Sequence, residues 1–178
     1  MRQFILCFSI CLLILLLSCS STNQNNLLPS STQRIVDRAE TAGFKTITIN
    51  APPFHLTSYE KSPPTPNALM RVYIEGDGNS WRTKTQLSNN PTPKHPLALE
   101  LAISDPHPQV IYIARPCQYT PLTLEPACDP KYWSSHRYAA EVIHAYNTAL
   151  DHLKEKAKNT NFILIGFSGG ASVAALLA

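Results

Sequence analysis

The sequence predicts an α/β domain in which an antiparallel pair of strands precedes a mainly parallel sheet with crossover helices. Three short apolar runs, at residues 70–74, 110–114 and 162–165, are rich in β-branched side chains and almost continuous in hydrophobicity. Runs of this kind are typical of strands that are buried on both faces of a parallel sheet. Between the last two runs, residues 134–158 place apolar side chains at helical spacing, which predicts the crossover helix that parallel strands require.

Weaker patterns supply the remaining elements. A shorter apolar pattern at residues 96–104 predicts the earlier crossover helix. Upstream, residues 45–49 alternate between polar and apolar side chains, and residues 54–59 follow across an Ala-Pro-Pro turn. This arrangement predicts a hairpin of two exposed antiparallel strands.

The composition and net charge indicate which classes of protein fit this chain. The chain has 178 residues, of which 44% are hydrophobic and 15% are charged, as expected for one globular domain rather than a disordered or fibrous protein. The formal net charge is +3, and no cluster of Lys and Arg is long enough to follow a phosphate backbone. We therefore expect no nucleic-acid partner.

The first residues have the features of an export signal. Residues 4–17 form an apolar run behind Arg2, shorter than the about 20 residues that a membrane span needs. Such a run is typical of the central region of a signal peptide, so residues 1–18 are expected to be removed on export. Leu-Leu-Ser-Cys at residues 16–19 resembles the bacterial lipobox, in which a small residue precedes a cysteine that receives diacylglycerol.

The lipobox resemblance implies that Cys19 becomes the acylated first residue and anchors an exported bacterial lipoprotein to a membrane. Ser20 follows rather than Asp, which by similarity to enteric sorting rules favours the outer membrane, facing the periplasm. An ordinary secretory signal and an uncleaved anchor remain as alternatives, and in both Cys19 is incidental. Residues 19–33 are rich in Ser, Asn and Thr and almost uncharged, which predicts a flexible tether before the domain at residues 34–178.

Two cysteines remain for the exported domain, because the other three lie in the signal or at the lipid site. In an oxidising compartment, Cys117 and Cys128 are expected to form a disulfide, with Cα atoms within about 7 Å of each other. The bond would stabilise the fold by roughly 2–4 kcal/mol. The alternatives are two free buried thiols, or a metal site that includes a histidine such as His136, although the usual ligand spacing is absent.

The apolar run at residues 162–165 continues directly into Gly-Phe-Ser-Gly-Gly at residues 166–170 and then into a good helix-forming segment. This is the pattern G-x-S-x-G between a strand and a helix. The pattern alone is common by chance, and its place between a strand and a helix is what makes it informative. Glycines flank Ser168 because larger side chains in so sharp a turn would collide with the strand and the helix. The sequence therefore predicts a tight turn with Ser168 at its apex.

With this motif the chain resembles the α/β-hydrolase family, and in particular bacterial lipoprotein serine hydrolases of the esterase and lipase type, from about residue 35 to residue 178. Two further segments carry the resemblance. They are Ile-Glu-Gly-Asp-Gly at residues 74–78, in the place of the oxyanion loop after the family's third strand, and Ala-Arg-Pro-Cys-Gln-Tyr at residues 114–119. Glu75 stands where the family usually has histidine, and residues 74–78 are alternatively a plain glycine-rich turn. The resemblance implies an incomplete α/β-hydrolase fold that ends after the nucleophile strand and helix.

The resemblance also implies serine hydrolase chemistry on a carboxylic ester or a related acyl bond. The Ser168 hydroxyl would attack the carbonyl of a small-molecule substrate, and the backbone N–H groups of Gly169 and Asp77 would stabilise the oxyanion. No metal or organic cofactor is implied. In this family the nucleophile is followed along the chain by an acid and then by a histidine. The ten residues after Ser168 contain no Asp, Glu or His.

All histidines precede the nucleophile. They are His55, His95, His107, His136, His144 and His152. His144 and His152 are expected to be solvated on the surface of the long predicted helix. Without a base, the chain is expected to be silent as a hydrolase and to be a truncated form of a longer enzyme. Two alternatives from other classes are a non-catalytic surface lipoprotein that keeps the fold as a binding scaffold, and the product of a decayed gene.

Overall fold

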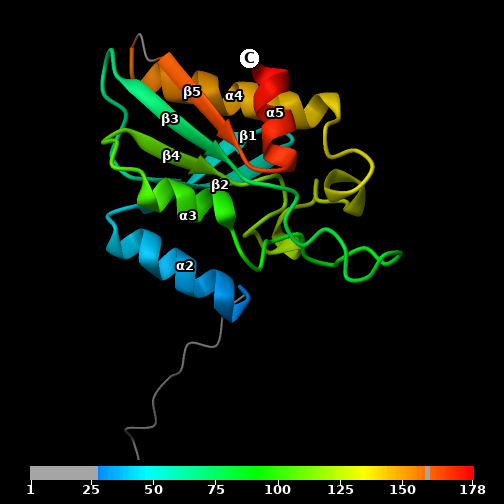
Figure 1. The fold of residues 1–178 in the computed structure, drawn as a ribbon. Coiled ribbons are helices and arrows are strands. Elements are labelled where there is room, and N and C mark those ends of the chain that lie inside the picture. The colour runs from blue at the N-terminus through cyan, green and yellow to red at the C-terminus, as the bar shows by residue number, and fades with distance from the viewer. Residues whose placement is uncertain (1–27, 159–160) are drawn as a thin grey trace, which may run out of the picture.

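The computed structural model describes residues 28–158 and 161–178 as a five-stranded sheet with helices on both faces (Figure 1). The strands are β1 (Lys45–Ala51), β2 (Phe54–Glu60), β3 (Leu69–Ile74), β4 (Val110–Ile113) and β5 (Asn161–Gly166). The α-helices are α2 (Ser30–Thr41), α3 (Leu97–Ser104), α4 (Ala140–Lys156) and α5 (Gly169–Leu177). Two short 3-10 helices, η1 (Leu122–Leu124) and η2 (Pro130–Trp133), lie in the long connection between β4 and α4.

The sheet has the strand order β1-β2-β4-β3-β5. β1 and β2 form an antiparallel hairpin, and β2 also pairs antiparallel with β4. β3 pairs in parallel with β4 on one side and with β5 on the other. The predicted α/β class, the predicted hairpin and the parallel pairing of the three strands after it are therefore confirmed, and the antiparallel pairing of β2 with β4 makes the whole sheet mixed.

Two apolar cores flank the sheet. Neighbouring side chains of a strand point to opposite faces, so each inner strand contributes to both cores. Val72 and Ile111 pack with Tyr146 in the core beneath α4 and α5. Tyr73 and Tyr112 pack in the core beneath α2 and α3. Figure 1 shows the same layers, with α2 and α3 on one side of the sheet and α4 and α5 on the other.

The crossover helices connect the strands that the sequence predicts them to connect. α3 joins β3 to β4, and α4 joins β4 to β5. However, the prediction of a helix from residue 134 is wrong at its start, because η2 and several turns precede Ala140. The carbonyl of Arg137 accepts a hydrogen bond from the guanidinium of Arg115 rather than from a helical N–H. A long-range contact therefore delays the start of α4.

Two predictions about burial are also wrong. β2 is an inner strand whose residues Phe54, Leu56 and Ser58 are buried, because β1 and β4 pair with it on its two sides. β5 lies at an edge of the described sheet, where only β3 pairs with it. Its residues are exposed or half-buried rather than buried on both faces.

The N-terminal boundary of the domain lies earlier than predicted. α2 begins at Ser30, so residues 30–33, which were expected to be tether, form the first turn of a helix. Thr32 is buried, and its hydroxyl donates to the Pro93 carbonyl at 2.6 Å. The apolar side of α2 packs against α3. Ser and Thr are weak helix formers, and the tertiary contact of Thr32 outweighs that preference.

The predicted disulfide between Cys117 and Cys128 is confirmed, with the two Cα atoms 5.6 Å apart. It joins the loop after β4 to the segment between η1 and η2. The predicted signal peptide at residues 1–18, the predicted lipid site at Cys19 and residues 19–27 of the predicted tether lie outside the described residues. Within the described ranges, no helix is both long enough and apolar enough to cross a membrane.

Asp105, at the end of α3, ties this helix to β3. Its buried carboxylate accepts hydrogen bonds from the Arg71 guanidinium and the Tyr73 hydroxyl, both at 2.8 Å, and from the His107 N–H at 2.9 Å. Burial by itself would raise the pKa of Asp105. The hydrogen bonds outweigh burial and hold the pKa below its ordinary value of 3.8.

A carboxyl group with a lowered pKa stabilises the fold above its ordinary pKa, and this stability is lost as the pH falls through the folded value. We expect Asp105→Asn to lower the free energy of unfolding at neutral pH by about 1–3 kcal/mol, because buried donors lose a charged acceptor. Urea unfolding should show a smaller difference from wild type at a pH below 3.8. Asp151→Asn, on the exposed side of α4, is the control. A difference that does not shrink in acid would contradict the assignment.

Candidate functional site

Ser168 lies at the turn between β5 and α5. Its backbone angles are φ 51° and ψ −119°, a conformation that residues with a side chain seldom adopt. The side chains of Ser168 and of its neighbour Phe167 are exposed. The predicted turn with Ser168 at its apex is therefore confirmed. Because Ser168 immediately precedes α5, it lies at the positive end of the helix dipole.

The glycines of this turn allow backbone to pack directly on backbone. A side chain at Gly170 would collide with the carbonyl oxygens of Ile74 and Glu75, at the end of β3. A side chain at Gly166 would collide with the backbone of Gly170. The first turn of α5 therefore rests on the end of β3 and brings Ser168 next to the loop that follows β3.

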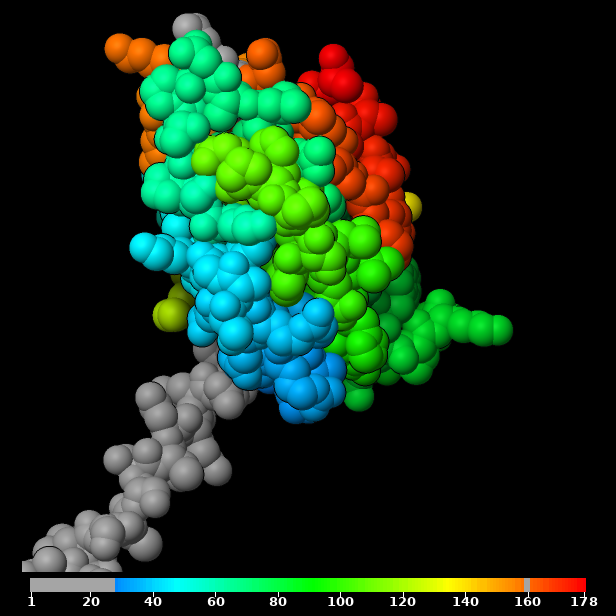
Figure 2. All heavy atoms as spheres, turned by 60° about the vertical axis from the view of Figure 1, so that its left-hand side comes forward, coloured from blue at the N-terminus to red at the C-terminus, as the bar shows by residue number. Residues whose placement is uncertain are grey.

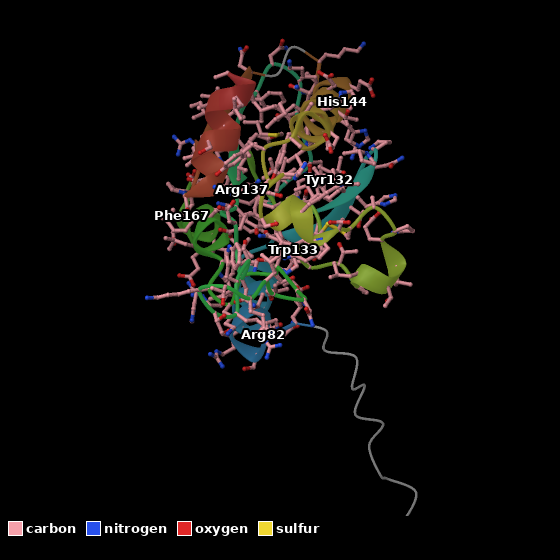
Figure 3. All side chains as sticks on the ribbon, turned by 90° about the vertical axis from the view of Figure 1, so that its right-hand side faces the viewer. Arg82, Tyr132, Trp133, Arg137, His144 and Phe167 are labelled. Carbon is pink, nitrogen blue, oxygen red and sulfur yellow. A yellow bond between two sulfur atoms is a disulfide. The ribbon has the colours of Figure 1, made fainter. Side chains whose placement is uncertain are left out.

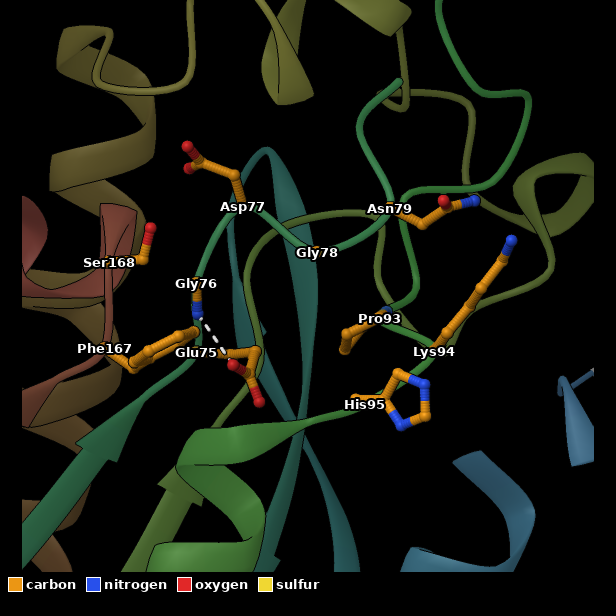
Figure 4. A pocket seen from close by; sticks show the side chains of 10 residues that line it. All are labelled: Glu75, Gly76, Asp77, Gly78, Asn79, Pro93, Lys94, His95, Phe167 and Ser168. Atoms are coloured by element: carbon orange, nitrogen blue, oxygen red, sulfur yellow. Dashed lines mark hydrogen bonds between the residues drawn. The ribbon is translucent and has the colours of Figure 1, made fainter. Parts of the chain in front are cut away.

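This loop carries backbone amides beside Ser168 (Figure 4). The N–H of Gly76 donates to the Glu75 carboxylate at 2.8 Å and is therefore occupied. In contrast, the N–H groups of Asp77 and Gly169 donate to no group in the part of the chain that the structure describes. The Asp77 carboxylate lies against the Cα atom of Gly169, where a side chain would collide with it. The structure thus brings together the three residues that the sequence singles out, Ser168, Asp77 and Gly169.

Glu75, in the place where the resembled family has histidine, ties the loop to its surroundings. Its buried carboxylate accepts hydrogen bonds from the Gly76 N–H at 2.8 Å and from the Tyr112 hydroxyl at 3.2 Å. Burial raises the pKa of Glu75 above its ordinary value of 4.5. The Gly76 amide, the Tyr112 hydroxyl and the amides of Ala98 and Leu99 at the start of α3 act in the opposite direction but do not outweigh burial.

The loop after β4 braces the loop after β3. Gln118 is fully buried, and its side-chain amide donates to the Gly76 carbonyl at 3.0 Å. The same side chain accepts a hydrogen bond from the N–H of Arg115 at 3.1 Å. Gly78 has φ 67°, which favours glycine, and a side chain there would meet the Gln118 amide. The loop after β4 therefore fixes the path of the loop that faces Ser168.

Two arginines hold the Asp77 carboxylate. Arg115 is buried, and its Nη1 atom lies 3.0 Å from Oδ1 of Asp77. Nε of Arg137 lies 3.4 Å from Oδ2 of Asp77, and 41% of the Arg137 side chain is exposed. Both guanidinium groups lie over the ring of Tyr138, at 5.4 and 4.9 Å from its centroid. The carboxylate is thereby fixed and neutralised, and one excess positive charge remains on this side of the site.

Ser168 borders a pocket of about 300 Å³ (Figure 4). Residues 75–79 form one side of it, and residues 93–95 form another. Figure 4 shows the Ser168 hydroxyl and the Asp77 carboxylate pointing in the same direction at one end, with Lys94 and His95 at the other. Ser168 and Asp77 therefore line this pocket, whereas Gly169 is buried directly beside them at the start of α5.

In the part of the chain that it describes, the structure places no base beside Ser168. Among the described residues, none forms a hydrogen bond with the Ser168 hydroxyl. His95 lines the same pocket but lies across it in Figure 4. His144 and His152 are exposed on α4, as the sequence predicts. Residues 28–158 and 161–178 also contain no group of three or more His, Cys, Asp or Glu side chains that could hold a metal ion.

The sequence did not predict that Arg115 and Arg137 pair with the Asp77 carboxylate or that Gln118 binds the Gly76 carbonyl. Arg115 and Gln118 lie in a polar segment directly after a buried strand, which is where a sheet commonly carries functional side chains. Arg137 falls within the segment predicted as helix from residue 134. The apolar pattern of that helix begins only at Ala139, which was the available signal that the preceding residues belong to a loop.

Comparisons of this chain with models of protein families, with curated proteins and with solved structures find no match. What the site can do is therefore inferred from its own geometry.

We expect Gly170→Ala to destabilise the protein, because the added methyl group would force α5 away from the end of β3. Overpacking of this kind costs about 1–3 kcal/mol. Urea unfolding followed by far-UV circular dichroism would measure the loss. Ser172→Ala, at an exposed position of the same helix, is the matched control and should change the free energy of unfolding by no more than about 0.5 kcal/mol. Equal stability of the two variants would show that α5 does not rest on β3.

Glu75 has a raised pKa, so its contribution to the stability of the fold changes with pH in the opposite sense to that of Asp105. Its contribution is present below the ordinary pKa of 4.5 and is lost as the pH rises through the folded value. We therefore expect Glu75→Gln to become more stable relative to wild type as the pH rises from about 4.5 to about 8. Urea unfolding at these two pH values tests this, with Glu155→Gln on the exposed side of α4 as the control. A constant difference between the Glu75→Gln variant and wild type would contradict it.

Proposed function

We propose that this chain is a serine hydrolase of carboxylic ester or related acyl bonds with an α/β-hydrolase type of fold. In this proposal Ser168 is the nucleophile, and the N–H groups of Gly169 and Asp77 are the oxyanion donors. One observation carries the proposal: a strained turn exposes Ser168 at the start of α5, next to two amides without another acceptor in the described part of the chain. Such strain clusters at functional sites. The mixed sheet, with its hairpin and crossover helices, is consistent with the fold.

The chemistry follows from the groups at the turn that carries Ser168. Attack by Oγ of Ser168 on an acyl carbon forms a C–O bond and moves negative charge onto the carbonyl oxygen. Two N–H donors stabilise that charge, and they are already fixed before the substrate binds. The hydroxyl proton must pass to a base and then to the leaving group. Because no described residue contacts the Ser168 hydroxyl as a base would, we expect slow turnover by these 178 residues.

The proposal includes export and anchoring. We propose that lipid on Cys19 holds the domain at a bacterial membrane, with the outer membrane facing the periplasm as the favoured place. The disulfide between Cys117 and Cys128 supports an oxidising compartment, where such bonds persist. Because α2 begins at Ser30, the residues between Cys19 and Ser30 would connect the lipid to the domain in this proposal.

A second candidate function is a non-catalytic surface lipoprotein that binds ligands through the same fold. The lack of a base beside Ser168 among the described residues favours it. The two candidates differ in one respect that can be measured, namely whether Ser168 is more reactive than an ordinary exposed serine.

The test uses a fluorophosphonate, which forms an Oγ–P bond and releases fluoride, while the hydroxyl proton goes to solvent. Ser172 provides an internal control, because it is exposed on the first turns of α5 but does not adopt the strained conformation of Ser168. We expect modification of Ser168 to be faster than that of Ser172 by about tenfold or more, because oxyanion donors alone contribute factors of this order. Tandem mass spectrometry of the purified chain assigns the modified serine.

Ser168→Ala should abolish the fast modification, whereas Ser172→Ala should leave it unchanged. Equal and slow labelling of both serines would overturn the hydrolase proposal and favour the binding scaffold. Turnover of a p-nitrophenyl ester by the same purified chain is measured in parallel with the labelling. Rapid turnover that disappears in Ser168→Ala would keep the hydrolase proposal but show that a base lies within these residues.

A further inference from the structure

A second cavity, of about 400 Å³, adjoins the pocket that Ser168 borders. The two share Asn79 and Lys94 in their linings, so they are adjacent, and we refer to the two cavities together as the trough. The second cavity is lined by residues of the connection between β3 and α3, and part of this connection projects from the body of the molecule (Figure 2, green). Figure 3 places Arg82 on this part of the surface, well below Phe167 and Arg137. Ser168 lines only the first cavity and Arg82 lines only the second, so the two residues lie at opposite ends of the trough.

The second cavity is positively charged. It is lined by Arg82 and Lys94, and neither forms an ion pair with any carboxylate in the described ranges. The trough contains two acidic residues, Glu75 and Asp77, and both lie at the Ser168 end. Glu75 is buried among its own hydrogen-bond donors, and Asp77 is paired with two arginines. No acidic side chain therefore offsets the two cations.

The cavity also has an apolar surface and a fixed frame. The side chain of Trp81 lines it, and 50% of this residue is exposed. Trp81 and Leu87 form a β-bridge across the loop. Nδ2 of Asn79 donates to the Ser88 hydroxyl at 3.0 Å, and the indole N–H of the buried Trp133 donates to the Ser88 carbonyl at 3.0 Å. The loop is thus attached to the domain at Ser88, and Trp81 is held at the edge of the trough.

We propose that this trough binds the anionic end of the substrate, so that the ester cleaved at Ser168 carries a carboxylate or phosphate on the part distant from the reacting carbonyl. Arg82 and Lys94 bind the anion, and Trp81 covers the apolar segment between the anion and the acyl group. The inference rests on the proposed function for the reacting end only. The binding of the anion itself needs no catalysis.

The experiment measures binding without turnover, in the full chain carrying Ser168→Ala. Three probes are compared by isothermal titration calorimetry: 4-acetoxybenzoate, its neutral methyl ester, and phenyl phosphate. We expect 4-acetoxybenzoate to bind about fivefold more tightly than the methyl ester, and added salt to reduce this preference, because partly exposed charges are screened. Tighter binding of phenyl phosphate than of 4-acetoxybenzoate would identify phosphate as the preferred anion, and weaker binding would identify carboxylate.

The double variant Arg82→Gln and Lys94→Gln should lose the preference for the anion. Lys84→Gln is the matched control, since Lys84 is an exposed cation on the same loop that does not line the trough. Trp81→Ala should weaken binding of 4-acetoxybenzoate and of its methyl ester to the same extent. Equal binding of these two probes by the unaltered trough, or a preference that survives the double variant, would overturn the inference.

The outcomes separate this inference from the proposed function. Fast fluorophosphonate labelling of Ser168 without a preference for anions would overturn the inference alone. A preference for anions without fast labelling would overturn the hydrolase proposal and leave an anion-binding trough.

Discussion

The contact between the first turn of α5 and the end of β3 is the constraint on which the site depends. Backbone meets backbone there, with Gly170 against the carbonyls of Ile74 and Glu75, so no side chain separates the helix from the sheet. This closeness determines both the sharpness of the turn and the strained angles of Ser168. It also brings the start of α5 beside the loop after β3, and these two segments supply the N–H donors of Gly169 and Asp77.

Charged side chains that line the trough are distributed unevenly, with the acidic ones at the Ser168 end and the basic ones in the second cavity. Glu75 and Asp77 are both used to hold the loop after β3, the first through Gly76 and Tyr112 and the second through two arginines. Both carboxylates are therefore held in contacts within the protein, while Arg82 and Lys94, which line the second cavity, form no ion pair in the described part of the chain. In the proposed reaction this arrangement favours the developing oxyanion, since an unpaired carboxylate nearby would oppose the same charge.

The sequence predicts those features that local pattern determines. Strands covered on both faces must be apolar throughout, so β3 and β4 were predictable, as were the helices α3 and α4 and the turn at Ser168 with its flanking glycines. Features that depend on polar contacts between distant parts of the chain could not be predicted in this way. The helix from Ser30 requires Thr32 to pack on a distant proline, and the delayed start of α4 requires the carbonyl of Arg137 to accept from a guanidinium. Such contacts leave no periodic signal in the chain.

The strand pairing also orders the steps by which the protein can fold. Ala51 pairs with its near neighbour Phe54, whereas Leu69 pairs with Asn161, with α3, β4 and α4 between them along the chain. Closing a long loop costs more entropy than closing a short one, so distant pairings form after local ones. The segment that contains Ser168 follows β5 and can reach its strained turn only when that strand has docked. The strained turn at Ser168 is therefore absent from partly folded chains, and its appearance marks the completion of the described sheet.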